Sequence, residues 1–516
     1  MKNLADTFGK SENDKAEEFK ELKITEKNEN NEERVKIEYL EETAKAENPE
    51  ENKNTVKKEK CRLLKALPLG ALFFALSSII VKGVGALYKI PLAALLGAEG
   101  VGLYQMIFPL YALLLIFSAS SVPTALTRII GGGYEKKSVV KKSFVLFLTI
   151  GAFSGAALFA FAGQISAAQG NENSATLYRV ISPAVLICSA IAVLRGILQG
   201  EGSFFYTSVS QIIEQCVKAA FGLTVLLVFS NVFGNDVIKK TATAVFAVVF
   251  SETVTLAYLI FAYKKRARAA NRVIIQKQAT AKPFGYKTLL FYVAPLCLTG
   301  LIMPLSAFSD SFIAVNALKQ NFTNATSMFG AFAGGSETVI ALPVGAITAF
   351  ATACLPELTE NPSSGKKMFA FCAAASAFSA VAIFLFSQNI TDLLFSRFGE
   401  YKAIVSALLK VSAVNVVFQS LLAVSNVCLL ALNKQAYSVF SMFTGLAIKV
   451  SLSVILVKNP QINLFGLVFS DSCFYFVALG LNLGYIISCS RKNAAACGFK
   501  SAKQNVLFCK KRGENL

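Results

Sequence analysis

Residues 67–96 read LPLGALFFALSSIIVKGVGALYKIPLAALL, a run in which Lys82 and Lys89 are the only charged side chains. A helix rises 1.5 Å per residue, so about 20 apolar residues cross a hydrocarbon core of ~30 Å. This run can therefore span a membrane as a helix, the element that satisfies its own backbone in lipid. Eleven similar runs follow it, so twelve spans are predicted: 67–96, 101–122, 143–166, 180–199, 208–230, 241–263, 288–310, 325–355, 368–388, 403–431, 436–457 and 464–488.

The composition agrees with a membrane protein. Of 516 residues, 54% are hydrophobic and only 16% are charged, and the mean hydropathy is +0.53, whereas soluble domains carry about 25% charged residues. The chain has no histidine, which excludes histidine catalysis and histidine-ligated metals. The 11 cysteines are scattered singly and are expected to be reduced, apolar residues. We predict no catalytic residue, no metal site and no enzyme.

The placement of charge predicts the topology. Residues 1–65 are rich in Lys, Glu and Asn and are expected to form a disordered charged cytoplasmic tail. With that tail inside, 29 basic residues fall in inside segments and seven in outside ones, which favours both termini in the cytoplasm. Because the cations lie in short loops between apolar runs, nucleic acid is not expected as a partner.

An internal repeat divides the chain. Aligning 179–223 with 410–454 without gaps pairs Arg179 with Lys410 and Lys218 with Lys449. The expected fold is all-α, with two pseudo-symmetric six-helix halves, the frame that many secondary transporters use. The predicted parts are the tail 1–65, a first lobe 66–263, a basic linker 264–287, a second lobe 288–490 and a basic cytoplasmic tail 491–516.

Charged residues inside the spans are the candidates for function, because burying a charge in a bilayer is costly. Lys82 lies near the middle of the first helix and is predicted to face the substrate. Lys89 could reach outward toward the headgroups, but an alignment of YKIPLA with SDSFIA places it opposite Asp310. The opposite charges of Lys89 and Asp310 could then form a gate or an ion-linked pair across the central cleft between the two halves.

Other intramembrane charges are candidates for coupling or gating. Glu214 and Lys218 share a helix face, as a self-satisfied pair or a functional one. Carboxylates that stand alone in their helices can take up a proton or bind Na⁺, and these are Glu252, Glu337 and Asp471. Lys410 and Lys449 look like flanking residues that anchor their helices. No cofactor is predicted beyond a coupling Na⁺ or H⁺.

Three segments carry a family resemblance: KGVGALYKIPLAALLGAEGVGLYQMIFPLYALLLIFSASSVPTALTRII (82–130), LRGILQGEGSFFYTSVSQIIEQCVKAAFGL (194–223) and, more loosely, SMFGAFAGGSETVIALPVGAITAFATACLPEL (327–358). They resemble the polysaccharide-transporter branch of the multidrug/oligosaccharidyl-lipid/polysaccharide exporter superfamily, the branch of oligosaccharide flippases and stage V sporulation protein B-like proteins. The resemblance implies two six-helix lobes around a central, alternately open cavity that carries an undecaprenyl-pyrophosphate-linked saccharide. It also implies that Lys82 lines this cavity and that Tyr88 and Lys89 occupy the place of a further charged pair.

The favoured function is therefore a flippase of a bacterial plasma membrane for a lipid-linked oligosaccharide or peptidoglycan precursor. Its expected partners are that lipid, the surrounding membrane lipids and cell-wall synthesis proteins. The alternative is a cation-coupled multidrug antiporter, although the basic first helix argues against a cavity made for cations. A scaffold that recruits wall-synthesis proteins through the 60-residue tail is a third hypothesis. Many flippases of this branch have fourteen helices rather than twelve, which leaves the identity of the cargo open.

Overall fold

The computed structural model describes residues 69–270, 284–360 and 364–512. The chain divides into two compact units, Met1–Leu72 and Phe73–Leu516, and the second contains the membrane-spanning helices. The predicted tail 1–65 and most of the predicted linker 264–287 lie outside the described residues.

The first half of the chain forms helices that match the predicted spans closely. Their bounds are α3 (Leu69–Leu115), η1 (Ile116–Ser120), α4 (Val122–Gly131), α5 (Lys136–Ala160), α6 (Ala162–Ala168), α7 (Ser174–Gly200), α8 (Phe204–Val228), α9 (Ser230–Phe233) and α10 (Val237–Ala270). Helix α3 breaks at Gly97, where φ is 69° and ψ is −178°, a conformation that favours glycine. The predicted spans 67–96 and 101–122 therefore meet at a kink.

The second half repeats the pattern of long helices joined by short ones. Its elements are α11 (Tyr286–Leu318), α12 (Ala325–Phe329), η2 (Gly330–Ser336), α13 (Glu337–Ala353), α14 (Leu355–Glu360), α15 (Ser364–Leu394), η3 (Ser396–Phe398), α16 (Tyr401–Ala431), α17 (Gln435–Val457) and α18 (Phe465–Arg512). Within the described residues, 11 helices are long and apolar enough to cross a membrane, and the first contains the kink at Gly97. The expectation of an all-α membrane fold is thus confirmed.

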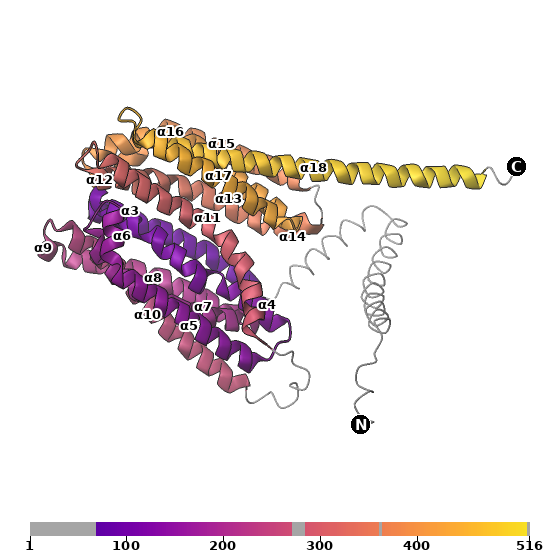
Figure 1. The fold of residues 1–516 in the computed structure, drawn as a ribbon, viewed down its shortest axis with the longest axis horizontal. Coiled ribbons are helices and arrows are strands. Elements are labelled where there is room, and N and C mark those ends of the chain that lie inside the picture. Colours follow the sequence, from indigo (N-terminus) through magenta and orange to yellow (C-terminus); the bar gives the residue numbers. More distant parts are fainter. Residues whose placement is uncertain (1–68, 271–283, 361–363, 513–516) are drawn as a thin grey trace, which may run out of the picture. The chain divides into compact units, whose positions relative to one another are not determined.

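Each half packs mainly on itself. In the first half, α7 contacts α4, α5 and α10, and α10 contacts α8; in the second half, α16 contacts α13, α15 and α18, and α17 contacts α11 and α18 (Figure 1). Helix α11 belongs to both halves. Its beginning packs into the core of the first half through Leu289 and Val293, whereas Ala314 and Val315 near its end belong to a core cluster of the second half.

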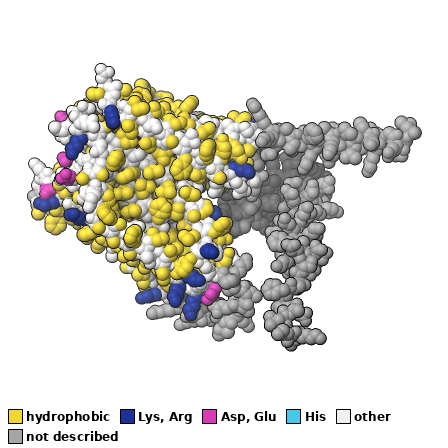
Figure 2. All heavy atoms as spheres, viewed as in Figure 1, with side chains coloured by type: hydrophobic (Ala, Val, Ile, Leu, Met, Phe, Trp, Pro, Cys, Tyr) yellow, Lys and Arg dark blue, Asp and Glu magenta, His cyan; other side chains and the backbone are white. Residues whose placement is uncertain are grey.

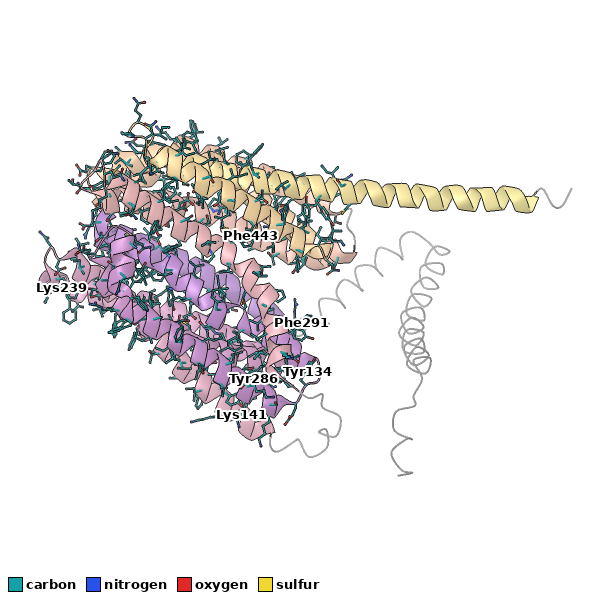
Figure 3. The ribbon with its side chains drawn as sticks, viewed as in Figure 1. Tyr134, Lys141, Lys239, Tyr286, Phe291 and Phe443 are labelled. Carbon is teal, nitrogen blue, oxygen red and sulfur yellow. The ribbon has the colours of Figure 1, made fainter. Side chains whose placement is uncertain are left out.

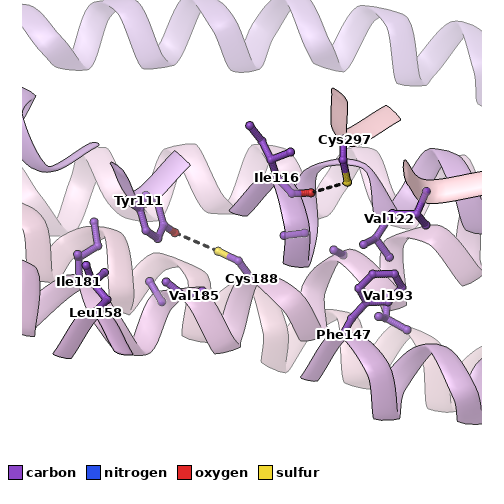
Figure 4. Packing of buried hydrophobic residues seen from close by; sticks show 14 of the residues in the cluster. Tyr111, Ile116, Val122, Phe147, Leu158, Ile181, Val185, Cys188, Val193 and Cys297 are labelled. Atoms are coloured by element: carbon purple, nitrogen blue, oxygen red, sulfur yellow. Dashed lines mark hydrogen bonds between the residues drawn. The ribbon is translucent and has the colours of Figure 1, made fainter. Parts of the chain in front are cut away.

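The core of the first half shows how α11 is attached. Buried aliphatic side chains from α5, α7 and η1 surround Tyr111, whose hydroxyl lies 3.2 Å from Cys188 Sγ (Figure 4). Beside them, Cys297 of α11 donates from its thiol to the carbonyl oxygen of Ile116 at 3.4 Å. Pro295 and Pro304 interrupt the hydrogen-bond ladder of α11, so this helix can bend between its two attachments.

The surface fits a membrane environment. Hydrophobic side chains cover the middle of the helices, whereas Lys, Arg, Asp and Glu gather toward the helix ends (Figure 2). Large apolar residues such as Phe153, Phe378 and Leu393 are largely exposed, as lipid-facing side chains are expected to be. Tyr134, Lys141 and Tyr286 lie at one end of the helices and Lys239 lies at the other (Figure 3), in agreement with the predicted separation of inside and outside loops.

Candidate functional site

Lys449 lies at the centre of a buried charged cluster in the second half. Its side chain, on α17, is 2% exposed, and its ammonium nitrogen lies 2.7 Å from Asp310 Oδ2 on α11 and 2.5 Å from Asp471 Oδ1 on α18. The ammonium also donates to Ser306 Oγ at 2.6 Å. Two carboxyl groups and a hydroxyl around the ammonium group allow a lysine to be buried with its charge. The prediction that Lys449 anchors the helix flank is therefore wrong.

A cavity of about 210 Å³ opens beside this cluster. Residues of α3 in the first half and of α11, α12, η2, α13, α16, α17 and α18 in the second half line it together: Gln105, Pro109, Met303, Ser306, Ala307, Asp310, Phe329, Phe332, Ala333, Glu337, Gln419, Lys449, Asp471 and Tyr475. Both halves thus contribute to one polar cavity. We call this the acidic cavity, because three carboxylates and only one ammonium group line it.

A second cluster lies in the first half. Arg195 on α7 donates from Nη2 to Glu214 Oε2 on α8 at 2.8 Å and from Nε to Ser210 Oγ at 2.9 Å. Glu252 on α10 is 7% exposed. The charge count assigns Arg195 to the inside segments although the predicted span 180–199 contains it; in the structure it lies within α7, which runs to Gly200.

The first-half cluster borders a cavity of about 430 Å³. One part of its wall is polar and the other consists of small and aliphatic residues; the lining is Leu115, Ala119, Ser120, Pro123, Thr124, Cys188, Ile191, Ala192, Arg195, Gln199, Gln211, Glu214 and Glu252. Arg195 and its partner Glu214 both line this cavity. The structure therefore brings Glu214 and Glu252 together at one cavity, although the sequence predicts them only as separate candidates.

The predicted partnership of Glu214 with Lys218 does not form. Glu214 pairs with Arg195 instead, and the Lys218 ammonium lies 6.0 Å from the centre of the Tyr88 ring, a cation–π arrangement. Tyr88 is buried in the core, and a Cβ at Gly222 would lie 2.8 Å from the Tyr88 hydroxyl oxygen. Close packing therefore holds the ring between helices, beneath Lys218.

The predicted pairing of Lys89 with Asp310 is also absent. Asp310 uses Oδ2 for Lys449, whereas Lys89 is an exposed side chain that lines a small pocket of about 20 Å³ with Tyr104, Gln105 and Thr338. Gln105 lines both this pocket and the acidic cavity. The backbone of Lys82 is helical, but its side chain lies outside the described residues, so its predicted role stays a prediction.

The two halves meet closely at the end where α11 finishes and α12 begins. A Cβ at Gly102 would collide with the Thr326 carbonyl oxygen, and one at Gly330 would collide with the Ala98 carbonyl oxygen. Gln169 also donates from Nε2 to Ser311 Oγ at 3.2 Å, which links the first half to α11. Glycine is required where backbones approach in this way. The two halves are therefore in direct contact at this end, which the charge distribution assigns to the outside.

Sequence reasoning misses the residues that organise the two clusters. It counts Arg195 only among the inside cations and Lys449 as an anchor, and it does not single out the polar residues Gln105, Ser306 and Gln419. One signal points to Lys449: the internal repeat that pairs it with Lys218. A lysine that recurs at one repeat position within apolar sequence is a better candidate for burial than for anchoring.

Comparisons with known proteins agree with the fold. The model of a family described as "Polysaccharide biosynthesis protein" matches residues 69–361. The lipid II flippase MurJ of Bacillus subtilis (strain 168) is 25% identical over 442 residues, which cover 80% of each chain. Stage V sporulation protein B of the same organism is 24% identical over 421 residues, 77% of this chain and 79% of that one. A solved structure of a lipid II flippase MurJ in an inward closed conformation superposes with a TM-score of 0.62 at 12% identity, covering 80% of this chain and 87% of that chain.

Proposed function

The chain belongs to the polysaccharide biosynthesis protein family, and on this premise we propose that it is a flippase for a lipid-linked saccharide precursor. Its cargo would be an undecaprenyl-pyrophosphate-linked oligosaccharide or peptidoglycan precursor, moved across a bacterial plasma membrane by alternating access. The two Bacillus subtilis relatives support this class of function. They also agree with the expectation of a transporter rather than an enzyme.

The observation that carries the proposal is a polar cavity lined by both halves and placed next to a closed contact between them. Gln105 and Pro109 of α3 face Asp310, Lys449 and other residues of the second half. An alternating-access transporter needs a site between two bundles and a barrier that closes one end of it. The glycine contact at Gly102 and Gly330 supplies such a barrier.

In this proposal the cationic residues of α3 receive the pyrophosphate. Lys89 is exposed and lines a pocket that shares one wall residue, Gln105, with the acidic cavity. A cation in a site of low dielectric constant attracts a pyrophosphate strongly. Lys82, two helical turns earlier on the same helix, is proposed to act at an earlier stage of the lipid's path. With both termini in the cytoplasm, as the loop charges predict, the end where the two halves are in contact faces outward.

Coupling to an ion gradient or to the membrane potential would drive the cycle. The membrane potential contributes about 2.3 kcal/mol per elementary charge per 100 mV. Glu252 in the first half is a coupling candidate that makes no ion pair within the described residues although it is 7% exposed. A proton or Na⁺ at such a carboxylate would remove an uncompensated charge from the membrane.

One observation favours the alternative of a cation-coupled multidrug antiporter. Three carboxylates line the acidic cavity, as a site for organic cations requires. The two functions differ in what accumulates when the protein is absent. Loss of a flippase leaves one polyprenyl-linked precursor on the cytoplasmic side, whereas loss of an antiporter leaves cationic compounds in the cell.

The test compares polyprenyl-linked precursors by mass spectrometry in cells with and without the protein. We expect one lipid species to accumulate without it, and we expect the wild type but neither Lys82→Ala nor Lys89→Ala to reverse this. Lys410→Ala is the matched control, because Lys410 is an exposed lysine on α16. Unchanged lipid pools together with increased retention of cationic dyes would reject the flippase and establish the antiporter.

A further inference from the structure

We propose that the acidic cavity binds a primary ammonium group carried by the cargo, so that the substrate is a lipid-linked saccharide with a free amine. This inference rests on the proposed function and specifies its substrate class. In this arrangement Lys89 receives the anionic end of the headgroup and the acidic cavity receives a cationic end.

The first argument is the charge balance of the cavity. Lys449 donates to Asp310 Oδ2 and Ser306 Oγ, and its ammonium nitrogen lies 2.5 Å from Asp471 Oδ1. It makes no ion pair with Glu337, whose side chain forms no hydrogen bond or ion pair among the described residues and lines the same cavity. Three carboxyl groups against one ammonium group leave at least one carboxyl group without a cationic partner, which a bound cation would supply.

The second argument is that the buried polar atoms of this cavity that lack a hydrogen-bond partner in the described part of the chain are acceptors. Asp310 is 8% exposed, and its Oδ1 has no hydrogen-bond partner in the described part of the chain. The same holds for the buried Oε1 of Gln419. A buried acceptor left unpaired costs about 1–3 kcal/mol. An ammonium group offers three donors and no acceptor, which is the complement of Asp310 Oδ1, Gln419 Oε1 and the Glu337 carboxylate.

The third argument separates an organic ammonium from a bare metal ion. The Lys449 ammonium already occupies the position between the Asp310 and Asp471 carboxyl groups that a metal ion bound by both would take. Among the described residues there is no group of three or more Cys, Asp or Glu side chains arranged to hold a metal. The cavity measures about 210 Å³, several times the roughly 30 Å³ that one water occupies. It therefore has room for an amine together with the carbon chain that carries it.

The fourth argument is the position of the cavity relative to Lys89. Gln105 lines both the Lys89 pocket and the acidic cavity, so the two are neighbours, and in this proposal one elongated headgroup extends over both. Opposite charges at its two ends would fix its orientation, as electrostatic complementarity does in other binding sites. A neutral saccharide would leave the acidic cavity without a partner.

The experiment measures binding of two matched lipids to the full-length protein in nanodiscs. One is an undecaprenyl-pyrophosphate disaccharide with a lysine-containing peptide, and the other is the same lipid with the lysine amine acetylated. We expect the free amine to bind about tenfold more tightly, because acetylation removes the charge and two of the three donors that the carboxyl groups would bind. Glu337→Gln should abolish the difference. Asp392→Asn should preserve it, because Asp392 pairs with Lys402 elsewhere, at 3.5 Å.

The outcomes distinguish this inference from the proposed function. Equal binding of both lipids by the wild type would overturn the inference and leave the flippase intact. Binding of neither lipid would overturn both. Tighter binding of both lipids in NaCl than in choline chloride, lost in Glu337→Gln, would assign the cavity to a metal ion and overturn the inference. Because the central comparison uses the wild type, the test stands even where the variant fails to fold.

Discussion

The two halves of the membrane-spanning unit bury their charges differently. In the first half, Arg195 and Glu214 form a single pair whose side chains are 15% and 19% exposed, at the wall of the larger cavity. In the second half, Lys449 is 2% exposed and lies between two aspartates from two other helices. Both clusters line a cavity, but the second is the more deeply buried, with the Asp310 and Asp471 side chains 11% and 4% exposed.

This difference is clearest at the repeated position. Lys218 and Lys449 are equivalent in the internal repeat, but Lys218 lies over the Tyr88 ring and Lys449 holds Asp310 and Asp471. A repeat therefore preserves the residue and its helix without preserving its partners. Since burial strengthens electrostatic interactions and raises the cost of breaking them, the two lysines should differ sharply in their effect on stability.

The largest effect is expected for Lys449→Met. The variant leaves two aspartates buried without their cation, which costs about 3–5 kcal/mol in the free energy of unfolding. Unfolding by SDS titration in bicelles measures the loss. Lys410→Met, an exposed lysine changed to the same residue, should unfold like the wild type. Equal stability of the two variants would show that the second-half cluster contributes no more than a surface charge.

A smaller effect is expected for Arg195→Met. It removes hydrogen bonds to Glu214 and Ser210, but the remaining carboxylate borders a cavity where water can solvate it. We expect a loss of about 1.5–3 kcal/mol by the same titration. The double variant with Glu214→Gln should recover part of this loss, and the cycle gives the pair energy. A loss equal to that of Lys449→Met would remove the distinction between the clusters.

The comparison also depends on the closed contact that holds the halves together. In Gly102→Ala the new methyl group collides with the Thr326 carbonyl, and such overpacking costs about 1–3 kcal/mol. We expect faster hydrogen–deuterium exchange in residues 98–106 and 326–334, because the halves separate there. Gly345→Ala is the control, since a Cβ at Gly345 has no neighbour within 4 Å. Unchanged exchange would mean that the contact adapts without opening.

The smallest effect is expected for Lys218→Met. The cation–π contact with Tyr88 contributes about 1 kcal/mol, and methionine retains most of the apolar stem. SDS titration should therefore place this variant near the wild type, well above Lys449→Met. A loss as large as that of Lys449→Met would contradict the view that equivalent repeat positions carry different partners.

Much of the fold could be predicted, and much less of the site. The spans are predicted to within a few residues, as 436–457 against Gln435–Val457 shows, because hydropathy is a property of each segment alone. The prediction that Glu214 pairs with Lys218 is wrong, because Glu214 pairs with Arg195 on the neighbouring helix. Spacing along one helix does not show which residues of another helix lie beside it. The pairing of Lys89 with Asp310 fails for the same reason. It rests on an alignment of segments, whereas Lys449 reaches Asp310 from a third helix.

The sequence by itself therefore determined the membrane character, the helical class and the two repeated halves. These follow from runs of apolar residues long enough to cross lipid and from one repeat within the chain. Only the tertiary structure decided which charges meet. Lys449 and Asp310 are 139 residues apart, and helices that are apolar on all sides do not show which face turns inward. Helix packing sets those rotations, and with them the acidic cavity and its unused acceptors.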